Sequence, residues 1–203
     1  FYGLFSGCES LTSAGELELP ATTLDRYCYS SMFSGCTSLE TAPNLPATSL
    51  GYFCYREMFS GCTSLKNAPD SLPATTLPMG CYYGMFRNCK SLINVFESLP
   101  AIRIYNDCYR YMFEGCESLV SAPKILGQGF LADAGCRNVE YMFSGCHSLE
   151  FVEVHFLGWP DRHTVGWMDG VKQNGIFRCP TSLQEPEIRG SDTIPEGWTI
   201  ETF

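Results

Sequence analysis

The sequence predicts an elongated solenoid of the α/β class, in which about six stacked units of short strands and short helices end in a non-repeating C-terminal cap. Three sequence elements that recur along the chain predict this architecture. A short turn that ends in cysteine returns at near-constant intervals, at Cys8, Cys36, Cys62, Cys89, Cys116 and Cys146. A Leu-Phe or Met-Phe pair precedes each turn, and a Leu-Pro-Ala element begins at Leu19, Leu45, Leu72 and Leu99. A unit of this length cannot bury its apolar face alone, so the copies must stack.

The segment Cys54–Phe59 is predicted to form a short helix in each unit. Its apolar residues stand at positions i, i+1, i+4 and i+5, which share one face at 3.6 residues per turn. Arg56 and Glu57 point away from that face. Gly61 follows, and it supplies the left-handed residue that ends a helix.

The segment Ser64–Ala68 is predicted to be a short strand. Pro69 ends it because proline has no N–H to donate to a β-ladder. Leu72–Leu77 then reads as an extended return, since a residue before proline is pushed toward β or polyproline geometry. Each unit is therefore expected to contain a strand, an extended return and a helix.

Stacking converts the equivalent apolar positions into ladders along the solenoid. Burial of each Phe or Leu stabilises the fold by roughly 1.5–3 kcal/mol, so these ladders should dominate stability. The heaviest ladder is Phe5, Phe33, Phe59, Phe86, Phe113 and Phe143. The others are Leu11, Leu39, Leu65, Leu92, Leu119 and Leu149, and Ala14, Ala42, Ala68, Val95, Ala122 and Val152.

Two regions are expected. Residues 1–155 form the solenoid, whose first repeat is incomplete because the chain opens partway through a unit, so further residues are expected upstream. Residues 156–203 lack the repeat and contain all three tryptophans, Trp159, Trp167 and Trp198. A terminal repeat needs a dissimilar cover, so this segment is predicted to be a cap packed on the last repeat.

Composition disfavours several classes of function. The formal net charge is −9 with only 13 Lys and Arg, which are scattered, so a nucleic-acid surface is not expected. No apolar run approaches the length of a membrane-spanning helix. Nucleotide-binding glycine loops and the calcium loop motif are missing from the sequence. No catalytic, cofactor-binding or metal-binding residue is predicted.

The twelve cysteines allow three interpretations. Buried thiols could form packing ladders, because free cysteine behaves as a small hydrophobe. Disulfides could join the pairs that stand eight residues apart, Cys28/Cys36, Cys54/Cys62, Cys81/Cys89 and Cys108/Cys116. Metal binding is the least favoured interpretation, since no pair has the tight spacing of a zinc site. Thiol ladders are favoured.

The sequence offers one candidate catalytic arrangement, a cysteine nucleophile activated by a histidine. Cys146 or Cys179 could pair with His147, His155 or His163, which lie near the cap. However, His147 occupies a repeat position that holds Thr elsewhere, so it reads as surface variation. A cysteine-dependent enzyme is thus the least favoured functional hypothesis.

Three motifs carry a resemblance to a known family. They are the sequence MFSGCTSL at 58–65, LPAT at 72–75 and CYxxMF at 54–59, each with several copies. These resemble BspA-like leucine-rich repeat proteins, a bacterial cell-surface group common in gut anaerobes, and the match covers residues 1–154. Cys136 stands six residues before Met142 rather than four, and the linker 124–133 lacks Leu-Pro-Ala, so the fifth unit departs from the pattern.

The resemblance implies a curved right-handed β/α superhelix on a secreted or lipid-anchored protein, with any lipid anchor upstream of this chain. It implies an extracellular or outer-surface location and adhesion to extracellular proteins. Solenoids use their concave strand face for binding. The repeat alignment places on that face the candidate ligand-facing residues Thr41, Asn67, Asn94, Ser121 and Phe151. Phe96, beside them, could form an aromatic patch with Phe151 or could be buried.

The sequence therefore predicts a non-enzymatic adhesion or recognition module whose partner is an extracellular protein or glycan. The alternative is a structural spacer within a larger surface protein. Saturable binding to an extracellular ligand would distinguish the two.

Overall fold

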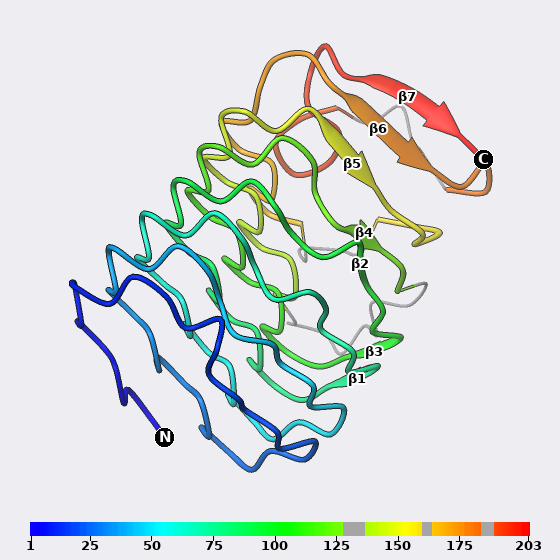
Figure 1. Ribbon diagram of the computed structural model, residues 1–203. Helices are drawn as coiled ribbons and strands as arrows, with labels where there is room; N and C mark the ends of the chain where they lie inside the picture. Colours follow the sequence, from blue (N-terminus) through cyan, green and yellow to red (C-terminus); the bar gives the residue numbers. More distant parts are fainter. Residues whose placement is uncertain (128–136, 160–163, 184–188) are drawn as a thin grey trace.

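The computed structural model describes residues 1–127, 137–159, 164–183 and 189–203. The chain winds into a stack of coils, one per repeat, with the two termini at opposite ends of the stack (Figure 1). The strands are short: β1 (Thr76–Leu77), β2 (Ser98–Leu99), β3 (Arg103–Ile104), β4 (Lys124–Ile125), β5 (Phe151–Glu153), β6 (Ile176–Cys179) and β7 (Thr199–Thr202). The predicted solenoid is confirmed.

Successive coils are joined by parallel pairing, as stacking of repeats requires. β1 pairs with β3, β2 with β4, and β5, β6 and β7 form a three-stranded parallel sheet. The extended return predicted over 72–77 contains β1. The strand predicted over Ser64–Ala68 is reduced to single parallel bridges from Asn67 to the coils on both sides.

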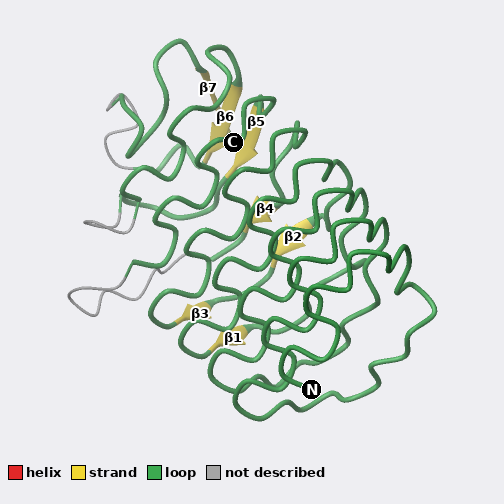
Figure 2. Cartoon of the chain, turned by 90° about the vertical axis from the view of Figure 1, so that its left-hand side faces the viewer, coloured by secondary structure: helices red, strands yellow, loops and turns green. Residues whose placement is uncertain are grey.

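The predicted helix at Cys54–Phe59 is wrong. Among the described residues the structure contains strands, turns and loops but no helix (Figure 2). Segment 53–62 is a run of overlapping turns, and the equivalent segments are 3–8, 27–36, 80–89, 107–116, 138–146 and 164–170. We call this set of segments the turn ribbon.

The hydrogen bonds explain why the ribbon is not helical. In an α-helix every N–H bonds to the carbonyl four residues back. In the ribbon, alternate N–H groups bond three residues back, as Met58 does to Tyr55 at 3.2 Å. The N–H groups between them donate to the next coil, namely Tyr55 to Cys81, Glu57 to Tyr83, Phe59 to Met85 and Gly61 to Arg87.

Left-handed residues recur every four positions along the ribbon. Gly61 has a φ of 77°, as the sequence predicted, but Glu57 and Phe53 also have φ values of 52° and 56°. Asn88 replaces glycine at the position equivalent to Gly61 with a φ of 58°, which asparagine tolerates better than most residues. A period of four places residues i, i+1, i+4 and i+5 on one side, and those residues form the apolar face.

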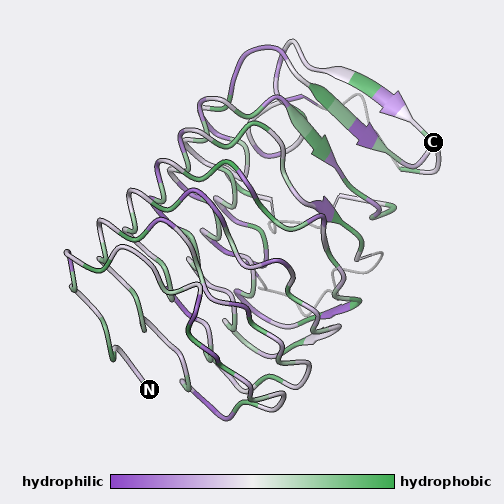
Figure 3. Cartoon of the chain, viewed as in Figure 1, coloured by the Kyte–Doolittle hydropathy of each residue, from purple (hydrophilic) through white to green (hydrophobic). Residues whose placement is uncertain are grey.

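The interior consists of the predicted ladders (Figure 3 shows hydrophobic residues recurring at matching positions of neighbouring coils). Phe33 to Phe143 are completely buried, and successive rings of the Phe ladder stack at centroid distances of 5.4–5.6 Å. The Leu ladder is equally buried from Leu39 to Leu149, whereas Ala68 and Val95 are only partly buried. A tyrosine ladder that the sequence analysis did not single out runs beside them, through Tyr29, Tyr55, Tyr82 and Tyr109.

The ribbon pattern continues past residue 155, the predicted end of the solenoid. The N–H groups of Tyr141, Phe143 and Gly145 bond to carbonyls in the segment 164–170. Trp167 is buried against Phe143, with a centroid distance of 6.1 Å, and so extends the Phe ladder. Its Nε1 donates to the carbonyl of Thr193 at 2.8 Å, and Trp198, 3% exposed, donates to the carbonyl of Lys172. Both tryptophans serve packing.

Candidate recognition face

The predicted ligand-facing residues lie in one row that crosses the coils. Parallel bridges join Thr41 to Asn67, Asn67 to Asn94 and Ser121 to Phe151. The side chains of Asn94 and Asn67 are also hydrogen-bonded, Nδ2 to Oδ1, at 2.7 Å. Asn94 and Ser121 are exposed, and the other three are half-buried. Bridges therefore join the row in two segments, Thr41 to Asn94 and Ser121 to Phe151, and its contact with a ligand stays a prediction.

A second row lies directly beside the first, one residue earlier in each coil. Its members are surface residues that the core does not use: Glu40, Lys66, Ile93, Val120 and Glu150. Lys172 of the following coil joins them through its ion pair with Glu150. Backbone bonds tie them across coils, for example from the Lys66 N–H to the Glu40 carbonyl at 3.0 Å. We call the two rows together the bridge face.

The bridge face has an apolar centre and charged ends. Ile93 is 51% exposed and Val120 is 42% exposed, and they occupy neighbouring coils. On one side the ammonium of Lys66 lies 2.9 Å from the carboxylate of Glu40, and on the other Lys172 pairs with Glu150. An apolar centre within a polar rim is the general arrangement of a protein-binding surface. Sequence reasoning missed Ile93 and Val120, although their position holds polar or charged residues in the other coils: Thr12, Glu40, Lys66 and Glu150.

The idea of an exposed aromatic pair, Phe96 with Phe151, is wrong for Phe96. Only 4% of Phe96 is exposed, and its ring lies 6.3 Å from those of Phe86 and Phe113. It stands where other coils place a buried proline, such as Pro69. The Phe96 ring, which is larger than a proline ring, therefore packs into the core and is not part of the surface. Phe151 remains half-buried in the row.

The cysteines form the expected thiol ladders in the described part of the chain, where eleven are free. The ladder at the end of the ribbon donates its thiols to Phe carbonyls of the preceding coil at 3.0–3.1 Å: Cys36 to Phe5, Cys62 to Phe33, Cys89 to Phe59, Cys116 to Phe86 and Cys146 to Phe113. Cys136 lies outside the described residues.

Burial suppresses the reactivity of these thiols. It raises the pKa of Cys54, Cys62 and Cys146 to about 12, because a thiolate loses its hydration in the core. The thiolate is the nucleophilic form of cysteine, so these groups are protonated and inert near neutral pH.

The two described histidines, His147 and His155, have partners other than a cysteine. The exposed His147 bonds through Nδ1 to the carbonyl of Gly170 at 2.8 Å, while the Cys146 thiol donates to Phe113. His155 pairs with Glu153 at 3.0 Å, and His163 lies outside the described residues. Within the ranges that the structure describes, no cluster of three or more metal-ligating side chains occurs. The same ranges contain no helix with the length and apolarity to cross a membrane.

The stacked parallel coils define a repeat solenoid, and the comparisons with other proteins concern this class. No protein-family model and no curated protein sequence matches the chain. Among solved structures the chain is similar to a leucine-rich repeat protein from Bacteroides ovatus, with a TM-score of 0.48 and 20% sequence identity. The similarity covers 86% of this chain and 39% of that one, so the chain spans well under half of that protein's length.

Proposed function

We propose that this chain is a non-enzymatic recognition module of the BspA-like leucine-rich repeat group, located outside the cell or on its outer surface. Its partners are extracellular proteins or glycans, and any lipid anchor lies upstream. The sequence motifs support the family and the location. The solenoid supports an interaction role, because such arrays present extended surfaces for binding.

The observation that carries this proposal is the exposed apolar centre of the bridge face. Ile93 and Val120 are about half exposed, whereas Leu92 and Leu119, which directly precede them, are completely buried. Exposed aliphatic groups framed by charged pairs favour a protein partner, which would cover the centre and meet the rim with hydrogen bonds. A spacer would have no need of this arrangement.

The test is binding of the purified chain to immobilised extracellular matrix proteins by surface plasmon resonance. The double variant Ile93→Asp/Val120→Asp should weaken binding by at least about tenfold, since central residues dominate interface energies. The matched control is Ile102→Asp, because Ile102 is 62% exposed and lies outside the bridge face. Equal effects of the two variants would contradict a role of the bridge face in binding. No saturable binding to any matrix protein would favour the spacer instead.

A further inference from the structure

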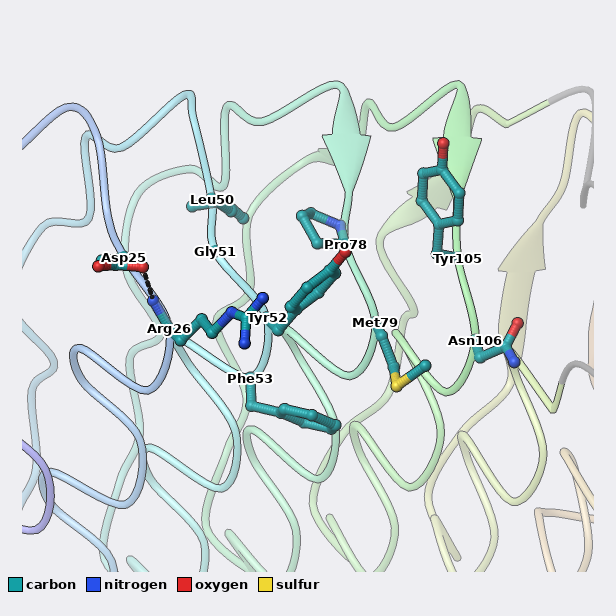
Figure 4. Close-up of a pocket in the computed structure, with 10 residues that line it drawn as sticks. All are labelled: Asp25, Arg26, Leu50, Gly51, Tyr52, Phe53, Pro78, Met79, Tyr105 and Asn106. Atoms are coloured by element: carbon teal, nitrogen blue, oxygen red, sulfur yellow. Dashed lines mark hydrogen bonds between the residues drawn. The ribbon is translucent and has the colours of Figure 1, made fainter.

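A second surface feature, separate from the bridge face, is an open groove that crosses the coils beyond the extended returns. It has a volume of about 610 Å³, and no residue of the bridge face lines it (Figure 4). This volume lies within the range of roughly 300–1,000 Å³ typical of ligand sites. Its lining combines aromatic rings with planar polar side chains.

Two glycines create the groove. Tyr27 stacks on Phe53 at a centroid distance of 5.2 Å, and the Phe53 ring then lies flat over Gly80. A Cβ at Gly80 would stand 2.4 Å from that ring, so only glycine lets Phe53 lie flat there as part of the lining. Gly51 likewise approaches the backbone of Asp25 so closely that a Cβ would stand 2.5 Å from it. The groove is thus built into the backbone.

Two half-exposed tyrosines stand over the groove. Tyr52 is 45% exposed and Tyr105 is 49% exposed, and both rings line the opening (Figure 4). The guanidinium of Arg26 lies 4.9 Å from the centroid of the Tyr52 ring and holds that ring in place. The two tyrosines belong to coils two apart, which corresponds to about 9–10 Å at the usual spacing of paired strands. This distance is comparable to the length of a disaccharide.

The charges of the groove cancel. Asp25 and Arg26 contribute one negative and one positive group at one end, and Asn106 contributes a neutral amide at the other. The chain as a whole carries −9, which repels anionic ligands. The groove therefore matches a ligand that has no net charge but carries many hydrogen-bonding groups.

We propose that this groove binds a neutral oligosaccharide of pyranose rings. The C–H faces of a sugar ring are weakly positive and pack against the negative faces of Tyr52 and Tyr105. The hydroxyl groups bond to Asp25 and Arg26, whose planar ends can each engage neighbouring hydroxyls. The proposal rests on the proposed recognition function, whose partners include glycans, and it assigns the glycan to this groove instead of to the bridge face.

The test is isothermal titration of the full chain with neutral hexasaccharides of β-1,4-linked glucose, xylose and N-acetylglucosamine. At least one of them should bind saturably. Tyr52→Ala and Tyr105→Ala should each weaken that binding about tenfold, whereas Tyr105→Phe, which keeps the ring, should change it little. Tyr2→Ala is the matched control, because Tyr2 is 69% exposed and does not line the groove.

Several results would overturn this assignment. They are no saturable binding of any hexasaccharide, binding that survives both tyrosine-to-alanine changes, and a preference for heparin or for a poly-L-proline peptide. The double variant Ile93→Asp/Val120→Asp separates the two proposals. It should abolish capture of a matrix protein and leave sugar binding unchanged, so the failure of one proposal leaves the other measurable.

Discussion

The turn ribbon and the C-terminal sheet both join one coil to the next, but they use different backbones and different side chains. In the ribbon, alternate N–H groups cross to the next coil, and identical Phe rings stack at 5.4–5.6 Å. In the sheet β5–β6–β7, whole strands pair in parallel, and unlike residues face each other, as Val152 does Phe177. The last segment of the ribbon, beside this sheet, already departs from identical stacking, because Trp167 meets Phe143 at a tilt of 56°.

The difference shows what each backbone demands of the sequence. Stacked identical rings need the same residue at the same place in every coil, so the ribbon keeps a strict repeat from Phe5 to Phe143. Strand pairing uses only backbone groups and accepts different side chains, so the C-terminal coils lose the sequence repeat while they keep the parallel stack. Regularity of sequence and regularity of fold are separable in this chain.

Removing a ring from the middle of the ribbon should have the largest effect. Phe86 is fully buried between Phe59 and Phe113, at 5.5 Å from each. Phe86→Ala should lower the free energy of unfolding by about 3–5 kcal/mol, because it leaves a cavity that rigid neighbours cannot fill. Urea denaturation measures this loss, and a loss below about 1 kcal/mol would contradict central packing of the ring.

The second effect concerns the C-terminal coils. Trp167→Phe removes the bond from Nε1 to the Thr193 carbonyl and leaves a gap beside Phe143. We expect a loss of about 1–3 kcal/mol, confined to the end of the stack, since each coil contacts only its neighbours. Amide hydrogen exchange should accelerate beyond residue 164 and stay slow in coils 27–116. Uniform acceleration along the chain would instead show that the stack unfolds as one unit.

Alkaline pH should weaken the ribbon more than the sheet, because the thiol ladders lie in the ribbon. The pKa of Cys62 rises to about 12 in the folded chain, against an ordinary value of 9.0, because of burial. The folded state therefore holds its proton longer than the unfolded state. This contribution to stability is complete below pH 9 and is lost between about pH 9 and 12, at on the order of 1 kcal/mol per pH unit for each such thiol. Cys62→Ala should flatten the measured dependence, and an unchanged slope would speak against a buried thiol.

The left-handed positions of the ribbon allow a test with a smaller expected effect, in which two substitutions should change stability in opposite directions. Gly84 and Glu57 are equivalent, since Glu57 donates to the carbonyl before Gly84, and their φ values are 57° and 52°. Gly84→Ala should cost about 1 kcal/mol, whereas Glu57→Gly should stabilise by several tenths of a kcal/mol. Thermal unfolding of both variants gives the comparison. Two destabilised variants would contradict the period of four.

The smallest expected effect is on the surface pairs of the bridge face. Lys66 and Glu40 are about half exposed, so water and salt screen their attraction. Lys66→Ala should change stability by no more than about 0.5 kcal/mol, and 1 M NaCl should act similarly on the wild type. Urea denaturation at two salt concentrations measures the contribution of this ion pair to the free energy of unfolding. A change above about 1 kcal/mol would contradict the expected screening.

The ladders could be predicted from the sequence and the helix could not, for one physical reason. Apolar residues at i, i+1, i+4 and i+5 fit a helix of 3.6 residues per turn and a ribbon with a period of four equally well. The discriminating signal is a series of left-handed-prone residues four apart, which is complete only at Gly80, Gly84 and Asn88 and is partial at Gly3 and Gly7 and at Gly166 and Gly170. In the coil before that of Gly80, Phe53 and Glu57 occupy two of the same positions and conceal the pattern.

The candidate face was predictable only in part. Thr41, Asn67 and Asn94 could be placed because the repeat aligns them, and the bridges confirm that they are neighbours. The side chain of Phe96 could not be placed, because a single-bridge strand gives no alternation to fix its phase. The groove beside Tyr52 depends on the approach of coils at Gly51 and Gly80, which only coordinates reveal.

The backbone bonds that cross the ribbon all have the same sense, from an N–H in the earlier coil to a carbonyl in the later one. Their dipoles therefore add along the stack, as peptide dipoles do along a helix. A coil inserted in the reverse direction would place N–H groups opposite N–H groups, which cannot form hydrogen bonds. Each coil therefore pairs only with a neighbour that runs in the same direction. The ribbon thus fixes the direction in which each coil must stack on the coil before it. A duplicated repeat would therefore be incorporated in the same orientation as its neighbours.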